Sequence, residues 1–229
     1  MKVITDIECL PNFFCIVFAE LDGEGIIAYE ISSRRDDREY IIATILAYTL
    51  LAYNSHHYDD ILMNYLIHSP DCTNYDLYLI SKAIIDGDRD TIRPYKYNKP
   101  FDSIDVMTMI ASSKLRVSLK HLQVVTNWHN VEEFECDWNE PLPEERWDDC
   151  IDYCKNDVLS LKHVCKLLKK DFELREYVQE RKGFECRSMS PVSIAEMDMA
   201  NAVAKKLGYS DTRKFMRDTV DKNSHVKKK

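Results

Sequence analysis

Four acidic residues and one tyrosine are the side chains of this sequence whose types and spacing could perform chemistry. They fall in three short motifs, which are Asp6-Ile7-Glu8, Asn54-Ser55-His56-His57-Tyr58-Asp59 and Tyr153-Cys154-Lys155-Asn156-Asp157. Carboxylate oxygens are the ligands that Mg²⁺ prefers in proteins, and they also suit Mn²⁺. Two such cations can clamp the attacking and leaving oxygens of a phosphodiester cleavage. The motifs together therefore predict a carboxylate site for two metal ions, with a tyrosine to orient a water molecule.

The first two motifs are placed by strands that are expected to end beside them. Because side chains alternate along a strand, Asp6 and Glu8 of the predicted strand 2–8 point to the same face. The second motif begins where a short apolar strand, 50–53, turns into a helix. Asn54 lies at the end of that strand, a position where ligand contacts gather in α/β sheets.

The remaining two carboxylates are placed by helices. Asp59 falls in the first turn of a predicted helix, where an acidic residue ordinarily stabilises the helix dipole. Asp60 could serve that ordinary role, which leaves Asp59 available for a metal ion. Tyr153 and Asp157 are four residues apart on a long predicted helix over residues 144–168, so their side chains share one helix face.

Hydrophobic periodicity predicts the elements that must position these motifs. We expect strands over residues 2–8, 13–21, 25–31, 50–53 and 103–106, and helices over residues 36–48, 58–67, 75–85, 118–125 and 144–168. Residues 86–100 and 138–143 are expected to be loops. Hairpins are antiparallel and helical crossovers are parallel, so the pattern predicts an α/β fold with a mixed sheet flanked by helices. We expect a domain over residues 1–170 and a helical extension over residues 171–229.

Composition limits the class of protein. The chain has 229 residues, 45% of them hydrophobic, which is enough for a sizeable core. Its net charge of -8 argues against a basic DNA-coating protein. The charge does not argue against a nuclease, because bound cations reverse the local field. The sequence contains no C-x-x-C pair, so buried reduced thiols are favoured over a zinc site at Cys150, Cys154, His163 and Cys165.

The ends of the sequence suggest where the protein works. No apolar run approaches the roughly 18 residues that a membrane span needs, and the N-terminus lacks the pattern of a signal peptide. We therefore expect a cytoplasmic protein. Lysine and arginine are concentrated after residue 204 and end in Lys227-Lys228-Lys229. This basic tail could contact a nucleic-acid backbone or another protein, or it could be a solvated terminus.

The three motifs, in this order, resemble the proofreading 3′→5′ exonuclease domain of family B DNA polymerases, a tyrosine-subtype branch of the DEDD exonucleases. The family patterns are D-x-E, N-x(2–3)-[FY]-D and Y-x(3)-D. Further segments resemble the exonuclease regions of bacteriophage DNA polymerases and the stretches of chain directly after those regions. These segments are Ser103-Ile104-Asp105-Val106, Ser118-Leu119-Lys120-His121-Leu122, Glu140-Pro141-Leu142-Pro143-Glu144-Glu145, Phe172-Glu173-Leu174-Arg175 and Ser193-Ile194-Ala195-Glu196. The resemblance covers residues 1–200.

The resemblance implies a ribonuclease H-like fold and a role for each motif residue. Asp6 would bridge two Mg²⁺ or Mn²⁺ ions, and Glu8 and Asp157 would hold the ion that generates the nucleophile. Asp59 would support the second ion, and Tyr153 would orient the attacking water.

The resemblance also implies a grip on a single-stranded DNA 3′ end. Asn54 would contact the strand, and the backbone at Cys9 and Leu10 would meet the terminal sugar. Phe13 and Tyr58 could stack against bases, since aromatic stacking holds single strands without sequence preference. For the segment from Arg89 to Lys99, which mixes cations and aromatics, a solvated loop is favoured over a DNA contact.

Three functions remain open from the sequence. The leading expectation is a 3′→5′ exonuclease acting on single-stranded DNA, in the host cytoplasm if a phage encodes it. We find no motif for polymerisation, so the chain is expected to be the proofreading part of a split or truncated polymerase, or a freestanding relative. An RNA-trimming exonuclease of the same superfamily is one alternative, since no residue identifies a 2′-hydroxyl reader. A non-catalytic adaptor that binds DNA or a separate polymerase chain is the other.

Overall fold

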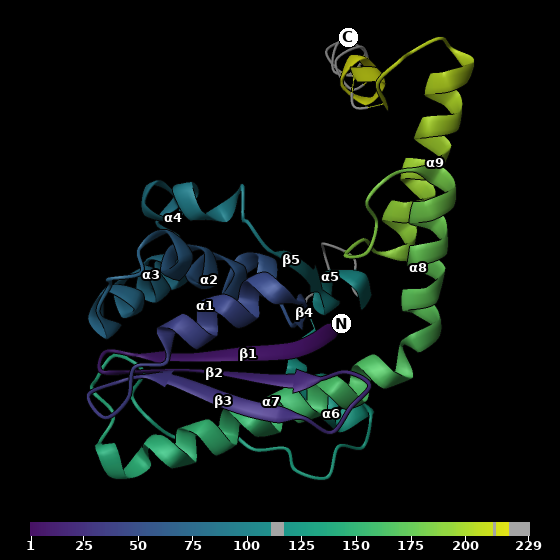
Figure 1. The fold of residues 1–229 in the computed structure, drawn as a ribbon. Coiled ribbons are helices and arrows are strands. Elements are labelled where there is room, and N and C mark those ends of the chain that lie inside the picture. The colour runs from purple at the N-terminus through teal and green to yellow at the C-terminus, as the bar shows by residue number, and fades with distance from the viewer. Residues whose placement is uncertain (111–116, 213, 220–229) are drawn as a thin grey trace, which may run out of the picture.

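A five-stranded mixed sheet forms the centre of the molecule in the computed structural model, which describes residues 1–110, 117–212 and 214–219 (Figure 1). The strands are β1 (Lys2–Leu10), β2 (Phe13–Glu20), β3 (Ile26–Ile31), β4 (Thr49–Ala52) and β5 (Asp102–Asp105). They lie in the order β3-β2-β1-β4-β5. The hairpins β1–β2 and β2–β3 are antiparallel, and β1–β4 and β4–β5 are parallel. The predicted α/β fold with a mixed sheet is therefore confirmed, and the arrangement is consistent with a ribonuclease H-like fold.

Strand β1 divides its side chains between two cores. Val3 and Ile7 belong to the core on one face of the sheet, and Ile4 and Leu10 belong to the core on the other. Asp6 and Glu8 occupy even-numbered positions like Ile4 and Leu10, so their side chains lie on the same face of the strand as that second pair. The alternation that buries β1 on both faces thus also places two carboxylates side by side on one of them.

Helices α1 (Arg38–Ala47), α2 (Asp59–His68) and α3 (Asn74–Asp86) cover the first face (Figure 1). They confirm the helices predicted over residues 36–48, 58–67 and 75–85. Helix α3 begins with a capping box. The Thr73 side chain accepts the backbone N–H of Asp76, and the Asp76 side chain accepts that of Thr73. The helix ends at Gly87, whose positive φ of 73° suits a residue without a Cβ.

The predicted loop 86–100 is wrong over most of its length, because residues Arg89–Lys96 form helix α4. Asp88 caps this helix by accepting the backbone N–H groups of Asp90 and Thr91. Ile92 is buried in the first core, so tertiary packing stabilises a helix that its polar composition does not suggest. Pro94 lies inside the helix and removes one backbone hydrogen bond, which makes the helix harder to recognise in the sequence.

Helix α7 (Trp147–Leu167) crosses the second face of the sheet (Figure 1). A 3₁₀ turn, Glu144–Arg146, precedes it and accounts for the first residues of the predicted helix 144–168. The buried side chains of α7 recur at helical spacing, and they include Trp147, Cys150, Ile151, Cys154, Val158, Leu161 and Cys165. All eight cysteines are free thiols. The same face also packs α5 (Val106–Ile110) and α6 (Leu119–Val125), and Ser118 caps α6 as its side chain accepts the His121 N–H.

Two helices, α8 (Lys169–Lys182) and α9 (Pro191–Lys206), project away from the sheet (Figure 1). The segment between them is tied to the body by Arg175, which is 1% exposed. Its guanidinium donates to the carbonyl oxygens of Met109, Asp171 and Met189 at 2.9–3.0 Å. The division at residue 170 stays a prediction. Residues 220–229, which include the terminal Lys227-Lys228-Lys229, lie outside the described part of the chain. No helix in the described part is long and apolar enough to span a membrane.

Candidate metal centre

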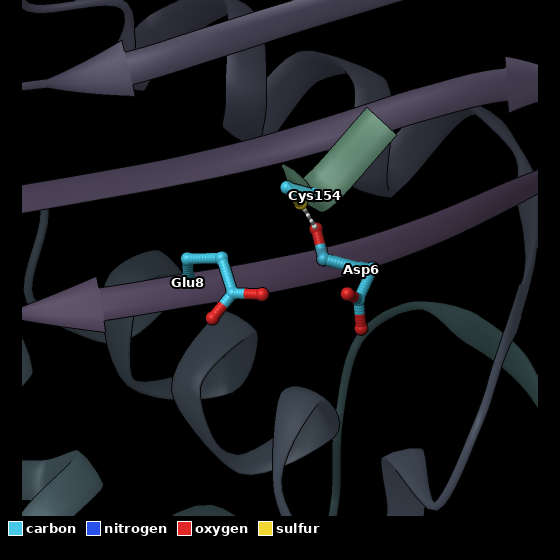
Figure 2. A group of neighbouring side chains, drawn as sticks. All are labelled: Asp6, Glu8 and Cys154. Atoms are coloured by element: carbon cyan, nitrogen blue, oxygen red, sulfur yellow. Dashed lines mark hydrogen bonds between the residues drawn. The ribbon is translucent and has the colours of Figure 1, made fainter. Parts of the chain in front are cut away.

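The two carboxylates of the first motif lie next to each other on β1. One carboxylate oxygen of Asp6, one of Glu8 and the Cys154 sulfur all lie within 4.8 Å of one another. Figure 2 shows the two acidic side chains beside each other along the strand, with Cys154 reaching the backbone of Asp6 from α7. The strand register that the sequence predicts therefore brings Asp6 and Glu8 together.

These carboxylates repel one another in a half-buried site. Burial and the charge of Asp157 raise the pKa of Asp6 from 3.8 to about 8. Burial and the charge of Asp6 raise the pKa of Glu8 well above its usual value, and Asp157 and Asp59 contribute to the same rise. All four carboxylates of the three motifs are thus coupled electrostatically. Among the described residues, Asp59 and Asp157 do not belong to the group of atoms within 4.8 Å of one another. Their carboxylates therefore lie farther from this group than Asp6 and Glu8 lie from each other.

Asp59 reaches the site from the first position of α2, where it is 3% exposed. Burial and the charge of Asp6 raise the pKa of Asp59 well above its usual value. The neighbouring Asp60 has its own partners, since Lys99 donates to it at 2.6 Å and Ser103 at 2.8 Å. The structure therefore separates the two adjacent aspartates, with one beside the first motif and the other in a polar cluster.

Asp157 is held by two donors that the three motifs do not contain. Lys120 donates to its Oδ1 atom at 2.7 Å, and Gln123 donates to the same atom at 2.8 Å. Both donors come from α6, so this short helix supplies a counter-charge to the carboxylate cluster. In the sequence, Lys120 falls in the segment 118–122, which resembles phage exonuclease regions. That resemblance does not by itself indicate that Lys120 belongs to the site.

Tyr153 lies beside the same lysine. The Lys120 ammonium is 4.4 Å from the centre of the Tyr153 ring, a distance typical of a cation–π contact. Burial, followed by the charge of Asp157, raises the pKa of the Tyr153 hydroxyl above its usual value. The hydroxyl therefore stays protonated near neutral pH and can donate or accept a hydrogen bond.

Cys154 is close to the carboxylates but is not suited to be a ligand. Its thiol donates to the backbone oxygen of Asp6 at 3.4 Å. Burial raises the pKa of this thiol, so the thiolate that would bind a metal is disfavoured. The donors that remain in the group are the carboxylates of Asp6 and Glu8, which fit hard cations such as Mg²⁺ and Mn²⁺ and do not fit a soft-metal site.

Asn54 has a backbone conformation that the sequence did not predict. Its φ is 61°, in the left-handed region that asparagine tolerates better than most residues. The fully buried Asp105 carboxylate accepts the N–H of Asn54 at 3.0 Å and that of Met107 at 2.9 Å. The Asn54 side-chain oxygen is buried and has no hydrogen-bond partner among the described residues. This oxygen is a candidate contact for a ligand.

Two of the other predicted substrate residues are closed off from solvent. Leu10 and Phe13 are both 0% exposed, and the Phe13 ring stacks on Trp147 with centroids 5.1 Å apart. The expectation that Phe13 stacks on bases is therefore wrong, because its ring already fills the core. Tyr58 and Cys9 instead line a pocket beside Glu8, where the Tyr58 hydroxyl is 2.6 Å from the Ser81 hydroxyl.

Comparison with known proteins adds no relative. No family model, no curated protein and no solved structure matches this chain. We therefore infer the function from the fold, the clustered carboxylates and their electrostatic coupling.

Proposed function

We propose that this protein is a metal-dependent 3′→5′ exonuclease that acts on single-stranded DNA ends. The observation that supports this best is the pair of carboxylates of Asp6 and Glu8, which have oxygens within 4.8 Å of each other. Burial and the charge of Asp157 raise the pKa of Asp6 in this cluster to about 8. A cluster of largely buried carboxylates destabilises the fold unless cations or protons neutralise it. Perturbed acids of this kind gather at functional sites.

Each motif residue has a separate task in this proposal. Asp6 would serve both cations, Glu8 and Asp157 would hold the one that activates water, and Asp59 would support the other. Bound Mg²⁺ or Mn²⁺ supplies Lewis-acid chemistry, in that it polarises the phosphodiester and lowers the pKa of water. The protonated Tyr153 hydroxyl orients the attacking water by a hydrogen bond.

Lys120 gives the site a second source of positive charge. It holds Asp157 at 2.7 Å and lies over the Tyr153 ring, so one cation fixes both residues of the third motif. The lysine also lowers the pKa of Asp6 and partly offsets the effect of Asp157. This arrangement keeps the carboxylates closer to their ionised, metal-binding form.

The substrate assignment rests on the order of the motifs and on the resemblance that they carry. The same resemblance suggests a proofreading role and a separate polymerase chain as a partner. An RNA substrate and a non-catalytic adaptor role are the two alternatives that a cleavage assay separates from the proposal.

The assay uses a 5′-labelled single-stranded DNA in the presence of Mg²⁺ or Mn²⁺, beside EDTA and a matched RNA. We expect a ladder that shortens from the 3′ end, disappears in EDTA and is slowed at least about a hundredfold in Asp6→Asn and Asp157→Asn. Asp152→Asn is the matched control, because Asp152 is exposed on the same helix and pairs with Lys155. Binding without cleavage in either metal would refute the proposal in favour of the adaptor, and faster loss of RNA would change the substrate.

A further inference from the structure

Helix α4 carries three cations without a counter-charge, Arg89, Arg93 and Lys96, which we call the basic face of α4. They form no ion pair and no side-chain hydrogen bond among the described residues, and Arg89 and Arg93 are exposed. They are four and three positions apart, so they follow one face of the helix over about 10 Å of its axis. The chain has a net charge of -8, so a run of unpaired cations is not explained by its overall composition.

The basic face opposes the formation of the helix that carries it. Cations three and four positions apart repel one another, and Arg89 lies at the first position, where the helix dipole disfavours positive charge. Pro94 removes a backbone hydrogen bond from the same helix. Arg93 and Lys96 suit the dipole at the C-terminal end, but that role leaves Arg89 unexplained. Violations of local rules such as these are expected at functional sites.

The inner face of α4 is anchored firmly on α2. Ile92 is buried in the first core, and the Tyr95 ring packs edge-on against the Tyr65 ring, with centroids 5.0 Å apart. The Asn64 side chain, which is 1% exposed, donates to the carbonyl oxygen of Tyr95 at 2.8 Å. These contacts hold α4 on the outside of the helical layer in spite of its unfavourable sequence (Figure 1). The basic face therefore has a fixed position on the surface.

The C-terminal end of α4 lies on the side of the metal centre. Lys99, three residues after the helix, donates to Asp60 at 2.6 Å, and Asp60 is the neighbour of the candidate ligand Asp59. Tyr97, the residue directly after the helix, is 63% exposed, so its ring is available at the surface. Arg89 lies at the other end of the helix. The aromatic ring and then the cations thus lead away from the carboxylates.

A row of cations that ends at an exposed aromatic ring suits a single-stranded nucleic acid. Lysine and arginine neutralise backbone phosphates, and an aromatic ring stacks on bases of any sequence. An acidic peptide would match the cations alone, because carboxylate side chains do not stack on an aromatic ring. The combination of charge and exposed ring therefore favours a nucleic acid over an acidic protein.

We propose that the basic face of α4 and Tyr97 bind the single strand upstream of its 3′ end, through backbone phosphates and one base. A solvated loop was expected over residues 89–99, and the helix that forms instead gathers the cations of this segment on one face. The proposal rests on the proposed function for the identity of the polyanion. It adds a contact that none of the three motifs supplies.

The test measures the affinity for a fluorescent oligonucleotide of about 12 thymidines by anisotropy, in Ca²⁺ and over about 50 to 300 mM salt. We expect the triple variant Arg89→Gln, Arg93→Gln and Lys96→Gln to bind about tenfold or more weakly at the lowest salt. The slope of log Kd against log salt should fall by about 2, since each phosphate contact on a single strand contributes about 0.7. Arg89→Lys combined with Arg93→Lys keeps the charge and should keep the slope.

Two further variants separate the ring from the cations and the local charge from the total charge. Tyr97→Leu should weaken binding about tenfold and leave the slope unchanged, because stacking releases no counterions. The matched control is the triple variant Lys166→Gln, Lys169→Gln and Lys170→Gln, which changes the net charge equally at exposed positions where α7 meets α8. It should bind nearly as wild type does, and all variants should keep the Tm of wild type.

The outcomes separate this proposal from the exonuclease. An unchanged slope in the α4 triple variant, or an equal loss in the control, would overturn the α4 contact and leave the exonuclease intact. A lower slope in a chain that cleaves neither DNA nor RNA would keep the contact and refute the exonuclease. Poly-glutamate that displaces the oligonucleotide at an equal concentration of charge would refute a nucleic acid as the partner of this surface.

Discussion

Replacement of Asp6 by asparagine is expected to stabilise the metal-free protein while it removes metal binding. Burial, followed by the charge of Asp157, raises the pKa of this side chain from 3.8 to about 8. Asparagine has nearly the same shape and carries no charge, so the substitution removes the repulsion without a cavity. Sites built for function commonly store instability of this kind.

The sign and the pH range of the effect are set by the direction of the pKa shift. Because the folded-state pKa lies above the unfolded value, the protonated form is favoured by the fold. The stability that protonation provides is complete below about pH 4 and is lost as the pH rises through about 8. Metal-free wild-type protein should therefore lose stability across this range, and Asp6→Asn should lose less.

The magnitude has an upper limit. A shift from 3.8 to about 8 would correspond to about 6 kcal/mol at about 1.4 kcal/mol for each pH unit. The carboxylates titrate together and share protons, so the part that belongs to Asp6 alone is smaller. We expect a gain of about 1–3 kcal/mol at pH 8, which for a chain of this size raises Tm by roughly 2–10 °C.

The assay is thermal unfolding in EDTA at pH 5 and pH 8, repeated with Mg²⁺. Asp6→Asn should unfold at a higher temperature than wild type at pH 8, and the difference should be roughly a third as large at pH 5. Mg²⁺ should raise the Tm of wild type at pH 8 and not that of the variant, since ligands stabilise the state that binds them. Asp152→Asn, exposed on α7, should behave like wild type throughout. A variant less stable than wild type at pH 8 in EDTA, or a gain of equal size at pH 5, would refute this reasoning.

Three further substitutions test separate parts of the structure. Lys120→Met should raise the pKa of Asp6 further, so the acid limb of the pH–rate profile should move up by as much as about one pH unit; an unmoved limb would count against the lysine's electrostatic role. Arg175→Met removes three hydrogen bonds to carbonyl oxygens, of which the one to Met109 is buried, and should cost about 3 kcal/mol in urea unfolding. The partly exposed Lys155→Met should cost less than about 0.5 kcal/mol. Phe13→Leu should cost about 1 kcal/mol yet leave single-stranded DNA affinity in Ca²⁺ unchanged, and weakened DNA binding would restore the base contact that burial denies to Phe13.

Predictions of structure from the sequence were most accurate where one local rule decides the conformation. Strand alternation was enough to place Asp6 and Glu8 on one face, and helical spacing was enough to place Tyr153 and Asp157 on one helix. Caps at Thr73 and Ser118 mark helices that the apolar pattern already indicates. Each of these features depends on residues within one element.

The features that were missed depend on contacts between distant segments. Lys120 and Asp157 are 37 positions apart in the sequence. Their contact depends on how α6 packs against α7, which local sequence patterns do not indicate. Helix α4 forms because Ile92 reaches the first core, although its composition is polar. Phe13 was assigned to the substrate because it is aromatic and near the first motif, but strand register turns it toward Trp147. Tertiary context decided all three.

The parallel part of the sheet has a consequence for how the protein folds. The strands β1, β2 and β3 pair residues that are close in sequence. Strand β4 joins β1, β5 joins β4, and α7 packs on β1 and β2, all from farther along the chain. Contacts between distant segments form late, because closing long loops costs entropy first. The carboxylate of Asp157 thus arrives beside Asp6 only when α7 docks. Charge repulsion is concentrated in that step, where divalent cations can speed assembly.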